Sequence, residues 1–261
     1  DLRMSRGLGD VYKRQHKARE RKDWDMISKR WMQRAFTVAV VCVSCSIFFC
    51  SEICRAKTAA KTTKVHTYKE GFTYQKLDSE TIARMRGKSY KKGAKIPLSR
   101  LRYLRLRYID FDGREQDGEM VVHKKIAKRT CKVFYELYRI KYPIAGMQLV
   151  DEYDADDEAS MAANNTSSFN YRKVANSSKM SKHSQGLAID INPRINPYIT
   201  KYGIAPANSK VYRNRNVATC RGKYRDYMIH RGDEVYRIFK KNGFSWGGDW
   251  KYSKDYQHFE R

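Results

Sequence analysis

Apolar and polar positions alternate in two distinct ways along the chain. Residues 101–111 (LRYLRLRYIDF) set large apolar side chains between arginines and end at Asp112-Gly113, which predicts a strand followed by a turn. Residues 124–142 instead repeat apolar side chains at helical spacing, which predicts an amphipathic helix. Shorter patterns predict helices at 79–86 and 233–242 and strands at 119–122, 147–150 and 187–191. Strands and helices occupy separate stretches, so we expect an α+β fold with a small antiparallel sheet flanked by helices.

A charge-free apolar run, residues 35–50, lies near the N-terminus. Lys29, Arg30 and Arg34 precede it, and a Lys/Thr/Ala-rich stretch follows it, a pattern typical of a secretory signal. The run is short for a membrane span, which needs roughly 20 residues, but residues 51–53 could extend it into an anchor. A buried core helix is a third interpretation. Signal and anchor both predict export, because the basic flank stays in the cytoplasm. We therefore expect the rest of the chain in the periplasm, in the cell wall or on the outer face of the membrane.

Four segments follow from these patterns. Residues 1–15 (DLRMSRGLGDVYKRQ) resemble translated adapter sequence of the kind found in assembled metagenomes, and a genuine disordered basic tail is the alternative. We therefore expect a non-native or disordered leader over 1–25 and a signal peptide or anchor over 26–56. A polar linker over 57–70 and one folded domain over 71–261 complete the chain.

Charge narrows the classes of partner. The hydrophobic fraction of 41% is enough for a globular core, but the formal net charge is +26. Residues 1–57 hold 13 basic and 6 acidic residues, a net +7, so +19 of the +26 belongs to the remainder. Such a charge favours polyanions, such as nucleic acid, an anionic membrane surface or an acidic wall polymer. The export pattern and the lack of a nucleic-acid motif argue against nucleic acid. Attraction to anionic wall polymers or lipid head groups is the simpler interpretation, and a merely solvated surface is the alternative.

Cysteines follow the same division of the chain. Four of the six lie in or beside the apolar run, without the paired C-x-x-C spacing of a zinc ribbon. Only Cys131 and Cys220 lie in the predicted folded domain. In an exported domain they could form one disulfide, or they could be two buried thiols. Both alternatives stay open.

Candidate chemistry is concentrated in two segments. The first, residues 181–190 (SKHSQGLAID), carries His183 and Asp190, and the second, residues 243–260, contains GFSWGGDW and ends in DYQHFE with His258. A catalytic zinc commonly takes three His or carboxylate ligands and leaves one position open for water. A loop entering a strand could bring His183 and Asp190 together, and His258 would arrive from a neighbouring strand or loop. Asp255, three residues before His258, could then act as a general base without being a ligand.

Taken together, these segments resemble the zinc D-alanyl-D-alanine carboxypeptidases of the VanY type, a family that includes phage endopeptidases cutting L-alanyl-D-glutamate bonds. Residues 160–172 (SMAANNTSSFNYR) extend the resemblance, which covers about residues 70–261. It implies a Hedgehog/DD-peptidase-like fold. It also implies zinc ligands at His183, Asp190 and His258, and a catalytic base at Asp255.

The resemblance implies a mechanism as well as a site. Asp255 would take a proton from zinc-bound water and pass it to the leaving amine, with Arg172 stabilising the oxyanion. Ser181 either hydrogen-bonds substrate or is a loop hydroxyl, Trp246 either lines the cleft or packs in the core, and Arg172 could be an ordinary surface residue. Asp249 and Glu260 are expected to be turn and surface carboxylates.

We therefore expect a monomeric, zinc-dependent D,D-carboxypeptidase that acts on peptidoglycan stem peptides. Cleavage of L-alanyl-D-glutamate bonds or of cross-links by the same residues is the first alternative. A non-catalytic cell-wall-binding module is the alternative of another class, and the presence of Asp255 argues against it, because a binder needs no base.

Overall fold

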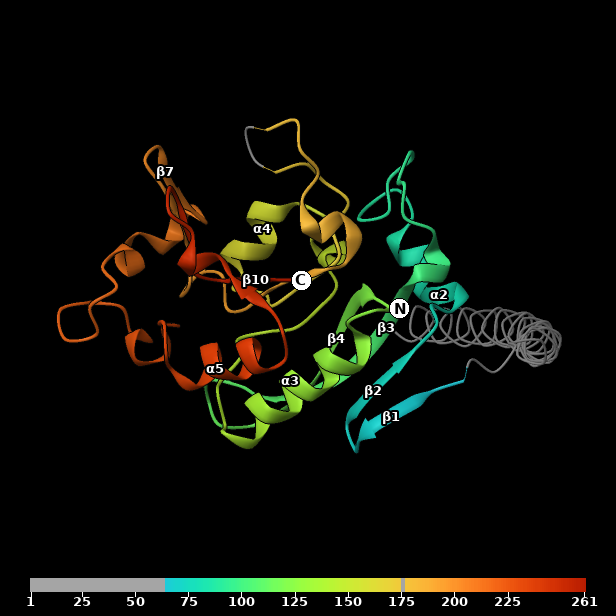
Figure 1. Ribbon diagram of the computed structural model, residues 1–261, viewed down its shortest axis with the longest axis horizontal. Helices are drawn as coiled ribbons and strands as arrows, with labels where there is room; N and C mark the ends of the chain where they lie inside the picture. The colour runs from blue at the N-terminus through green and yellow to red at the C-terminus, as the bar shows by residue number, and fades with distance from the viewer. Residues whose placement is uncertain (1–63, 175–176) are drawn as a thin grey trace, which may run out of the picture. The chain divides into compact units, whose positions relative to one another are not determined.

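The computed structural model describes residues 64–174 and 177–261 (Figure 1). The expected leader and the expected signal peptide or anchor, including the apolar run 35–50, lie outside the described residues. Within the described part, no helix is long and apolar enough to cross a membrane. The fold is α+β with small antiparallel sheets, which confirms the predicted class.

The first sheet has four antiparallel strands in sequence order. These are β1 (His66–Lys69), β2 (Phe72–Gln75), β3 (Leu101–Ile109) and β4 (Glu115–His123). The predicted strand at 101–111 is β3, and its chain turns at Asp112-Gly113 into β4, where Ile109 pairs with Glu115. The strand predicted at 119–122 is the second half of β4. β1 lies inside the predicted linker 57–70, so that boundary was wrong and the folded part begins earlier.

Helix α3 (Ala127–Arg139) covers one face of this sheet (Figure 1). It buries its apolar stripe, including Val133, Phe134 and Leu137, against inward-facing residues of β2 and β3. The predicted helix 124–142 is longer at both ends. The chain leaves the helix at Lys141, where φ is +53°, a left-handed conformation that an α-helix cannot continue. Helix α2 (Ser79–Met85) begins beside Asp78, whose carboxylate accepts a hydrogen bond from the Thr81 N–H.

Two further three-stranded sheets follow in the C-terminal half. In the first, β10 (His258–Glu260) lies between β5 (Ala188–Asp190) and β8 (Ser245–Trp246). In the second, β6 (Tyr198–Thr200) lies between β7 (Gly203–Ala205) and β9 (Lys254–Asp255). All these pairs are antiparallel. Only two residues, Tyr256 and Gln257, separate β9 from β10, so the two sheets meet near residues 255–258.

Short helices complete the described part. α5 (Glu234–Lys241) starts at the N-cap Asp233 and packs on α3, and α4 (Asp157–Ala162) starts at the N-cap Asp156. The 3₁₀ turns are η2 (Leu98–Arg100), η3 (Val150–Tyr153), η4 (Lys182–Gln185), η5 (Ala207–Arg213), η6 (Arg225–Tyr227) and η7 (Gly247–Asp249).

One element predicted from the sequence was wrong. The predicted strand at 147–150 does not form, although Met147 and Leu149 are buried. The Met147 carbonyl accepts a hydrogen bond from the Glu119 N–H, but the chain then turns into η3 and does not continue along β4. A short apolar run is compatible with a strand or with any buried segment, so its burial alone did not determine its backbone.

Cys131 and Cys220 are two free, buried thiols. Cys131 lies on α3 in the main core, and Cys220 lies in a separate cluster with Ile195, Tyr212 and Met228. Burial raises the pKa of the Cys131 thiol to about 12, so it stays protonated and unreactive near neutral pH. The two-thiol alternative therefore describes this pair, and the disulfide does not.

Candidate metal centre and active site

The segment that carries His183 is a capped turn. Ser181 precedes η4, and its hydroxyl accepts a hydrogen bond from the His183 N–H at 3.2 Å. Gly186 ends η4 with φ at +64°, and a Cβ there would lie 2.7 Å from the backbone nitrogen of His123. A residue without a side chain is therefore needed at position 186. Ser181 and Gly186 thus fix the turn that directs the His183 side chain into the protein.

Asp190 and His258 are brought together by strand register. Asp190 ends β5, His258 begins β10, and the two residues are direct partners in the antiparallel pair. Side chains of directly opposed residues project from the same face of a sheet. His183, entering from η4, reaches the same point, and all three side chains are buried. The structure therefore places together the three residues predicted as ligands.

The donor atoms of this group are evenly spaced. His183 Nε2 lies 3.1 Å from Asp190 Oδ2, His258 Nδ1 lies 3.1 Å from Asp190 Oδ1, and the two ring nitrogens are 3.1 Å apart. Ligands about 2.0–2.1 Å from a tetrahedral zinc ion are about 3.3 Å from one another. In the part of the chain that the structure describes, this is the group of His and carboxylate side chains close enough to hold a metal.

The ring nitrogens that face away from Asp190, His183 Nδ1 and His258 Nε2, determine the tautomer of each ring through their hydrogen bonds. His183 Nδ1 lies 2.5 Å from the Ser168 carbonyl oxygen, to which it can only donate. His258 Nε2 lies 3.2 Å from Glu260 Oε2 and donates to that carboxylate. The other two nitrogens, His183 Nε2 and His258 Nδ1, face each other and Asp190 and are therefore the ones that would bind a metal. Metal-binding histidines characteristically donate their second N–H to a carbonyl or carboxylate in this way. The donor set therefore fits a zinc ion.

Electrostatics at this point favour a cation. Burial alone would lower the pKa of His258, but the hydrogen bonds and charges of Asp190 and Glu260 outweigh it and raise this pKa to about 10. Burial opposes the ionisation of Asp190, yet the two histidines hold the pKa of its carboxyl far below its usual range. The carboxylates thus stabilise positive charge between the imidazole rings, whether a proton or a metal supplies it.

Asp255 lies beside this group at the end of β9. As a residue it is only partly buried, but its Oδ1 atom is shielded from solvent and has no hydrogen-bond partner among the described residues. Burial raises the pKa of its carboxyl to about 7, with His258 opposing the shift and Asp190 adding to it. A carboxyl with one free oxygen atom and a pKa near neutrality is suited to exchanging protons. Asp255 does not belong to the group of His183, Asp190 and His258, and its role as a base stays a prediction.

Gly247 explains how Asp255 approaches so closely. A Cβ at position 247 would lie 2.6 Å from the carbonyl oxygen of Asp255, 2.8 Å from its Cβ and 3.2 Å from the Cβ of His258. No side chain fits in that space without moving the backbone of β9. The Trp-Gly-Gly motif thus allows η7 to pack directly against both candidate catalytic positions.

Arg172 lies close enough for its charge to lower the pKa of Asp255. Its Nε donates to Asp157 at 2.7 Å, and its Nη1 donates to the Lys173 carbonyl at 3.3 Å. Asp157, which the sequence analysis did not single out, therefore holds this guanidinium. The structure places Arg172 near the site, and its role in the chemistry stays a prediction.

Two residues predicted to contact substrate, Trp246 and Ser181, are buried and have structural roles. Trp246 is only 3% exposed, packs on Phe259, and donates its indole N–H to the Tyr256 carbonyl at 2.9 Å. Ser181 is 5% exposed and caps η4. Neither side chain presents surface to a ligand, so their predicted contacts with substrate gain no support.

Sequence reasoning missed two other residues at the site. Trp250, four positions after Trp246, is partly exposed, and its ring centroid lies 5.3 Å from that of His258. Glu260, expected to be a surface carboxylate, is the hydrogen-bond partner of His258, so that expectation was wrong. Its position two residues after His258 in a strand was a usable signal, because such residues share one face. Asp249 forms an ion pair with Arg231 at 2.7 Å.

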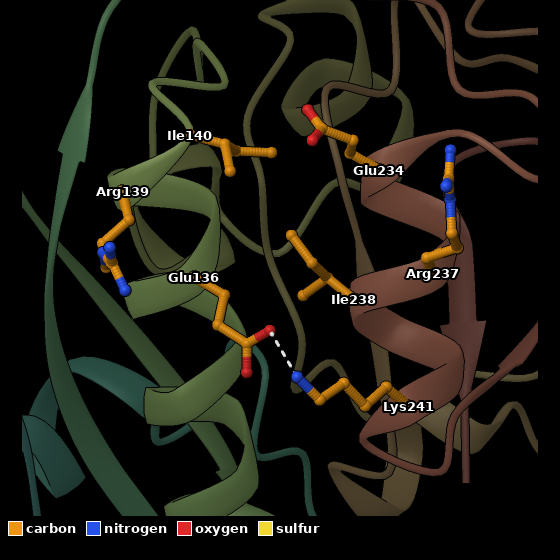
Figure 2. Close-up of a pocket in the computed structure, with 7 residues that line it drawn as sticks. All are labelled: Glu136, Arg139, Ile140, Glu234, Arg237, Ile238 and Lys241. Carbon is orange, nitrogen blue, oxygen red and sulfur yellow. Dashed lines mark ion pairs between the residues drawn. The ribbon is translucent and has the colours of Figure 1, made fainter.

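A groove between α3 and α5 is separate from this site (Figure 2). It has a volume of about 410 Å³, and none of the predicted site residues lines it. Ile140 and Ile238 face one another across it, and an ion pair joins Glu136 on α3 to Lys241 on α5 at 3.8 Å. The groove is thus a charged seam between two packed helices, and the candidate chemistry lies elsewhere.

Comparison with known proteins agrees with this geometry. Residues 175–261 match a family model described as D-alanyl-D-alanine carboxypeptidase. The matched segment carries all three ligand candidates and Asp255. It confirms the resemblance predicted from the sequence over this C-terminal third of the chain, and it supports a peptidase. No match was found among curated proteins or among solved structures.

Proposed function

We propose that this chain is a zinc-dependent peptidase that cleaves peptidoglycan stem peptides, with D-alanyl-D-alanine carboxypeptidase as its main activity. One observation carries the proposal. Two imidazole nitrogens and a carboxylate converge at 3.1 Å, and both outer ring nitrogens are satisfied by the protein. Asp255, whose Oδ1 atom has no hydrogen-bond partner among the described residues, lies alongside. The family match over residues 175–261 supports the peptidase class and the type of substrate.

Each residue has a role in the proposed reaction. His183, Asp190 and His258 would hold zinc, which when bound supplies a polarised water and an electrophile for the scissile carbonyl. Asp255 takes the proton of the attacking water and gives it to the leaving amine. Arg172, held by Asp157, stabilises the negative charge that develops on the carbonyl oxygen. Glu260 and the Ser168 carbonyl keep both histidine rings in the tautomer that leaves the inner nitrogens free.

Two alternatives use the same residues differently. An L-alanyl-D-glutamate or cross-link endopeptidase would need the same four groups but a longer cleft. A wall-binding module that retains zinc would have no use for the Asp255 Oδ1 atom, which is shielded from solvent and has no hydrogen-bond partner among the described residues, because leaving such an atom unpaired costs stability. Asp255 therefore favours an enzyme over a binding module.

We also propose that the protein acts outside the cytoplasm as a monomer. The basic flank and apolar run in residues 29–50 support export. Attraction of its net positive charge to anionic wall polymers or lipid head groups would concentrate it near its substrate. Binding to isolated cell walls should then weaken between low and high salt, because exposed charges are screened within about 10 Å at 0.1 M.

Mass spectrometry of purified muropeptides after incubation with the zinc-loaded chain tests the proposal. Loss of one terminal alanine supports the carboxypeptidase, whereas loss of a cross-link or release at L-alanine supports an endopeptidase. No change in any muropeptide would contradict a peptidase. In parallel, His183→Ala and His258→Ala should lose zinc, and His66→Ala, an exposed residue on β1, should keep it. Unchanged zinc content in both ligand variants would refute the metal site.

A further inference from the structure

A second cavity lies against the turn that carries His183. Its volume is about 310 Å³, and the proposed reaction uses none of the side chains that form it. The apolar part of its wall is formed by Ile96, Pro97 and Met180. Lys95, Arg100, His123 and Gln185 add nitrogen-bearing side chains to the lining. Among the described residues that line this cavity none is acidic, and we call it the cationic pocket.

The cationic pocket and the metal centre share η4. Successive side chains of a 3₁₀ helix point about 120° apart, so neighbouring residues face different directions. His183 turns inward to Asp190, while Ser184 and Gln185 line the pocket. Ser184 also fixes the backbone of Arg172, accepting from its N–H at 3.0 Å and donating to its carbonyl at 2.5 Å. A ligand in the pocket would therefore contact the turn that positions a proposed metal ligand.

Unpaired positive charge surrounds the pocket. Lys95 and Arg100 line it, and Arg102, Lys124 and Lys125 lie close enough for their charges to act on His123. Within the described ranges, none of these five side chains forms an ion pair with a carboxylate. Like charges so close to one another repel, and an anion placed among them would relieve that repulsion.

His123 contributes a fixed neutral donor. The residue is 9% exposed, and its Nδ1 accepts a hydrogen bond from the Lys125 N–H at 3.1 Å. The neutral ring must therefore carry its proton on Nε2. Burial, followed by the charges of Lys125 and Arg100, lowers the pKa of His123 and keeps the ring neutral. The backbone N–H of His123 also donates to the Gly186 carbonyl at 2.7 Å, which ties this residue to the end of η4.

We propose that the cationic pocket binds a carboxylate carried on a short aliphatic segment, supplied by an acidic residue of the same stem peptide that enters the metal centre. Arg100 and Lys95 bind the carboxylate charge, His123 and Gln185 donate neutral hydrogen bonds, and the apolar wall covers the aliphatic carbons. This assignment rests on the proposed function, because it takes the stem peptide as the ligand.

Reach and shape favour this ligand over a polymer phosphate. A 3₁₀ helix rises about 2 Å per residue, so Gln185 lies roughly 4 Å along η4 from His183. An extended peptide advances about 3.3–3.6 Å per residue, so a peptide of a few residues is longer than this segment of η4. A phosphodiester would leave the wall of Ile96, Pro97 and Met180 without an apolar partner.

Direct binding tests the pocket independently of activity. The full chain with ¹⁵N-labelled histidine is titrated with glutarate, with its uncharged analogue glutaramide and with inorganic phosphate. Glutarate should shift the His123 ring resonances, and glutaramide should not. Arg100→Gln should weaken glutarate binding about 5- to 10-fold, as expected for loss of one charge-assisted contact, whereas Arg100→Lys should recover most of it. Lys91→Gln, which removes one exposed charge outside the pocket, is the matched control.

Measurements of KM and kcat test whether the stem peptide is the ligand of the cationic pocket. Wild type should cleave a stem peptide carrying D-glutamate with a lower KM than one carrying D-isoglutamine, and at a similar kcat. Arg100→Gln should abolish that KM difference, and Lys91→Gln should preserve it. Equal KM values for both peptides in wild type would refute the stem peptide as the ligand.

The possible failures are distinguishable. If wild type cleaves neither peptide yet glutarate still shifts His123, the proposed function fails and the carboxylate site remains. If glutarate leaves His123 unchanged, if Arg100→Gln matches Lys91→Gln, or if phosphate binds more tightly than glutarate, the carboxylate assignment is overturned.

Discussion

His258 and Glu260 are two residues apart on β10, and the ring N–H of His258 meets the Glu260 carboxylate across 3.2 Å. Alternate residues of a strand share one face, so the backbone itself aligns this pair. The same face presents the other ring nitrogen of His258 to Asp190. One short strand thus carries both a proposed metal ligand and the carboxylate that orients it.

Glu260→Gln should therefore weaken zinc binding without unfolding the protein. Gln can still accept the His258 N–H, but it removes the negative charge that makes the imidazole a stronger ligand. Loss of such a supporting carboxylate commonly costs about 10- to 100-fold in metal affinity. Competition with a chromophoric chelator measures the affinity. Glu234→Gln, on α5, is the control and should bind zinc as wild type does, and an unchanged affinity in Glu260→Gln would exclude this role.

Asp255 and Asp190 should respond differently to the same isosteric change. Asp255→Asn should retain zinc and lose about 10²- to 10⁴-fold in kcat, because it removes a proton acceptor and leaves the ligands in place. Asp190→Asn should lower zinc affinity, because it removes the anionic ligand. Zinc content and muropeptide turnover are measured on both variants. Release of zinc from Asp255→Asn, or its near-normal turnover, would show that Asp255 is not the base.

Asp255 should also make the metal-free protein less stable as the pH rises. Burial raises its folded-state pKa to about 7, from an ordinary value near 3.8. Between these values the folded state holds a proton that the unfolded state has released, so stability falls by up to about 1.4 kcal/mol per pH unit. The fall is complete above about pH 7. Asp255→Asn removes it.

Thermal unfolding in the presence of a chelator measures this effect. The Tm of Asp255→Asn should exceed that of wild type at pH 8, and the difference should shrink toward pH 4. Comparing the two proteins at each pH cancels the contributions of Asp190 and the histidines to first order. A Tm difference that is constant from pH 4 to 8 would mean that the Asp255 carboxyl titrates normally.

Gly247→Ala should impair catalysis by displacing Asp255. The added Cβ would meet the Asp255 backbone at 2.6 Å, so β9 must move. Such overpacking typically costs about 1–3 kcal/mol of stability, and we expect turnover to fall at least about 10-fold. Gly146→Ala is the matched control, because a Cβ there has no neighbour within 4 Å. Parallel measurements of kcat and Tm separate the two effects, and wild-type turnover in Gly247→Ala would contradict the close-approach argument.

The sequence alone determined the α+β class, the elements with strong periodicity and the identity of the residues that converge. Strand β3, helix α3 and helix α5 carry long or well-capped patterns, and local pattern fixes such elements because burying one face requires it. His183, Asp190 and His258 have side chains of the types that bind zinc, and these three residues and Asp255 lie in segments that resemble the motifs of the zinc carboxypeptidases. By contrast, the run at 147–150 was too short for its burial to define a strand.

Only the tertiary structure decided how the site is supported. The register of β5 with β10 joins positions 68 residues apart in sequence, Gly247 admits Asp255, and the Ser168 carbonyl and Glu260 fix the histidine tautomers. Packing likewise placed Trp246 in the core and left Trp250 beside His258, although both belong to one aromatic-glycine motif. Side-chain type shows what chemistry a residue can do, whereas long-range backbone packing decides which atoms it can reach.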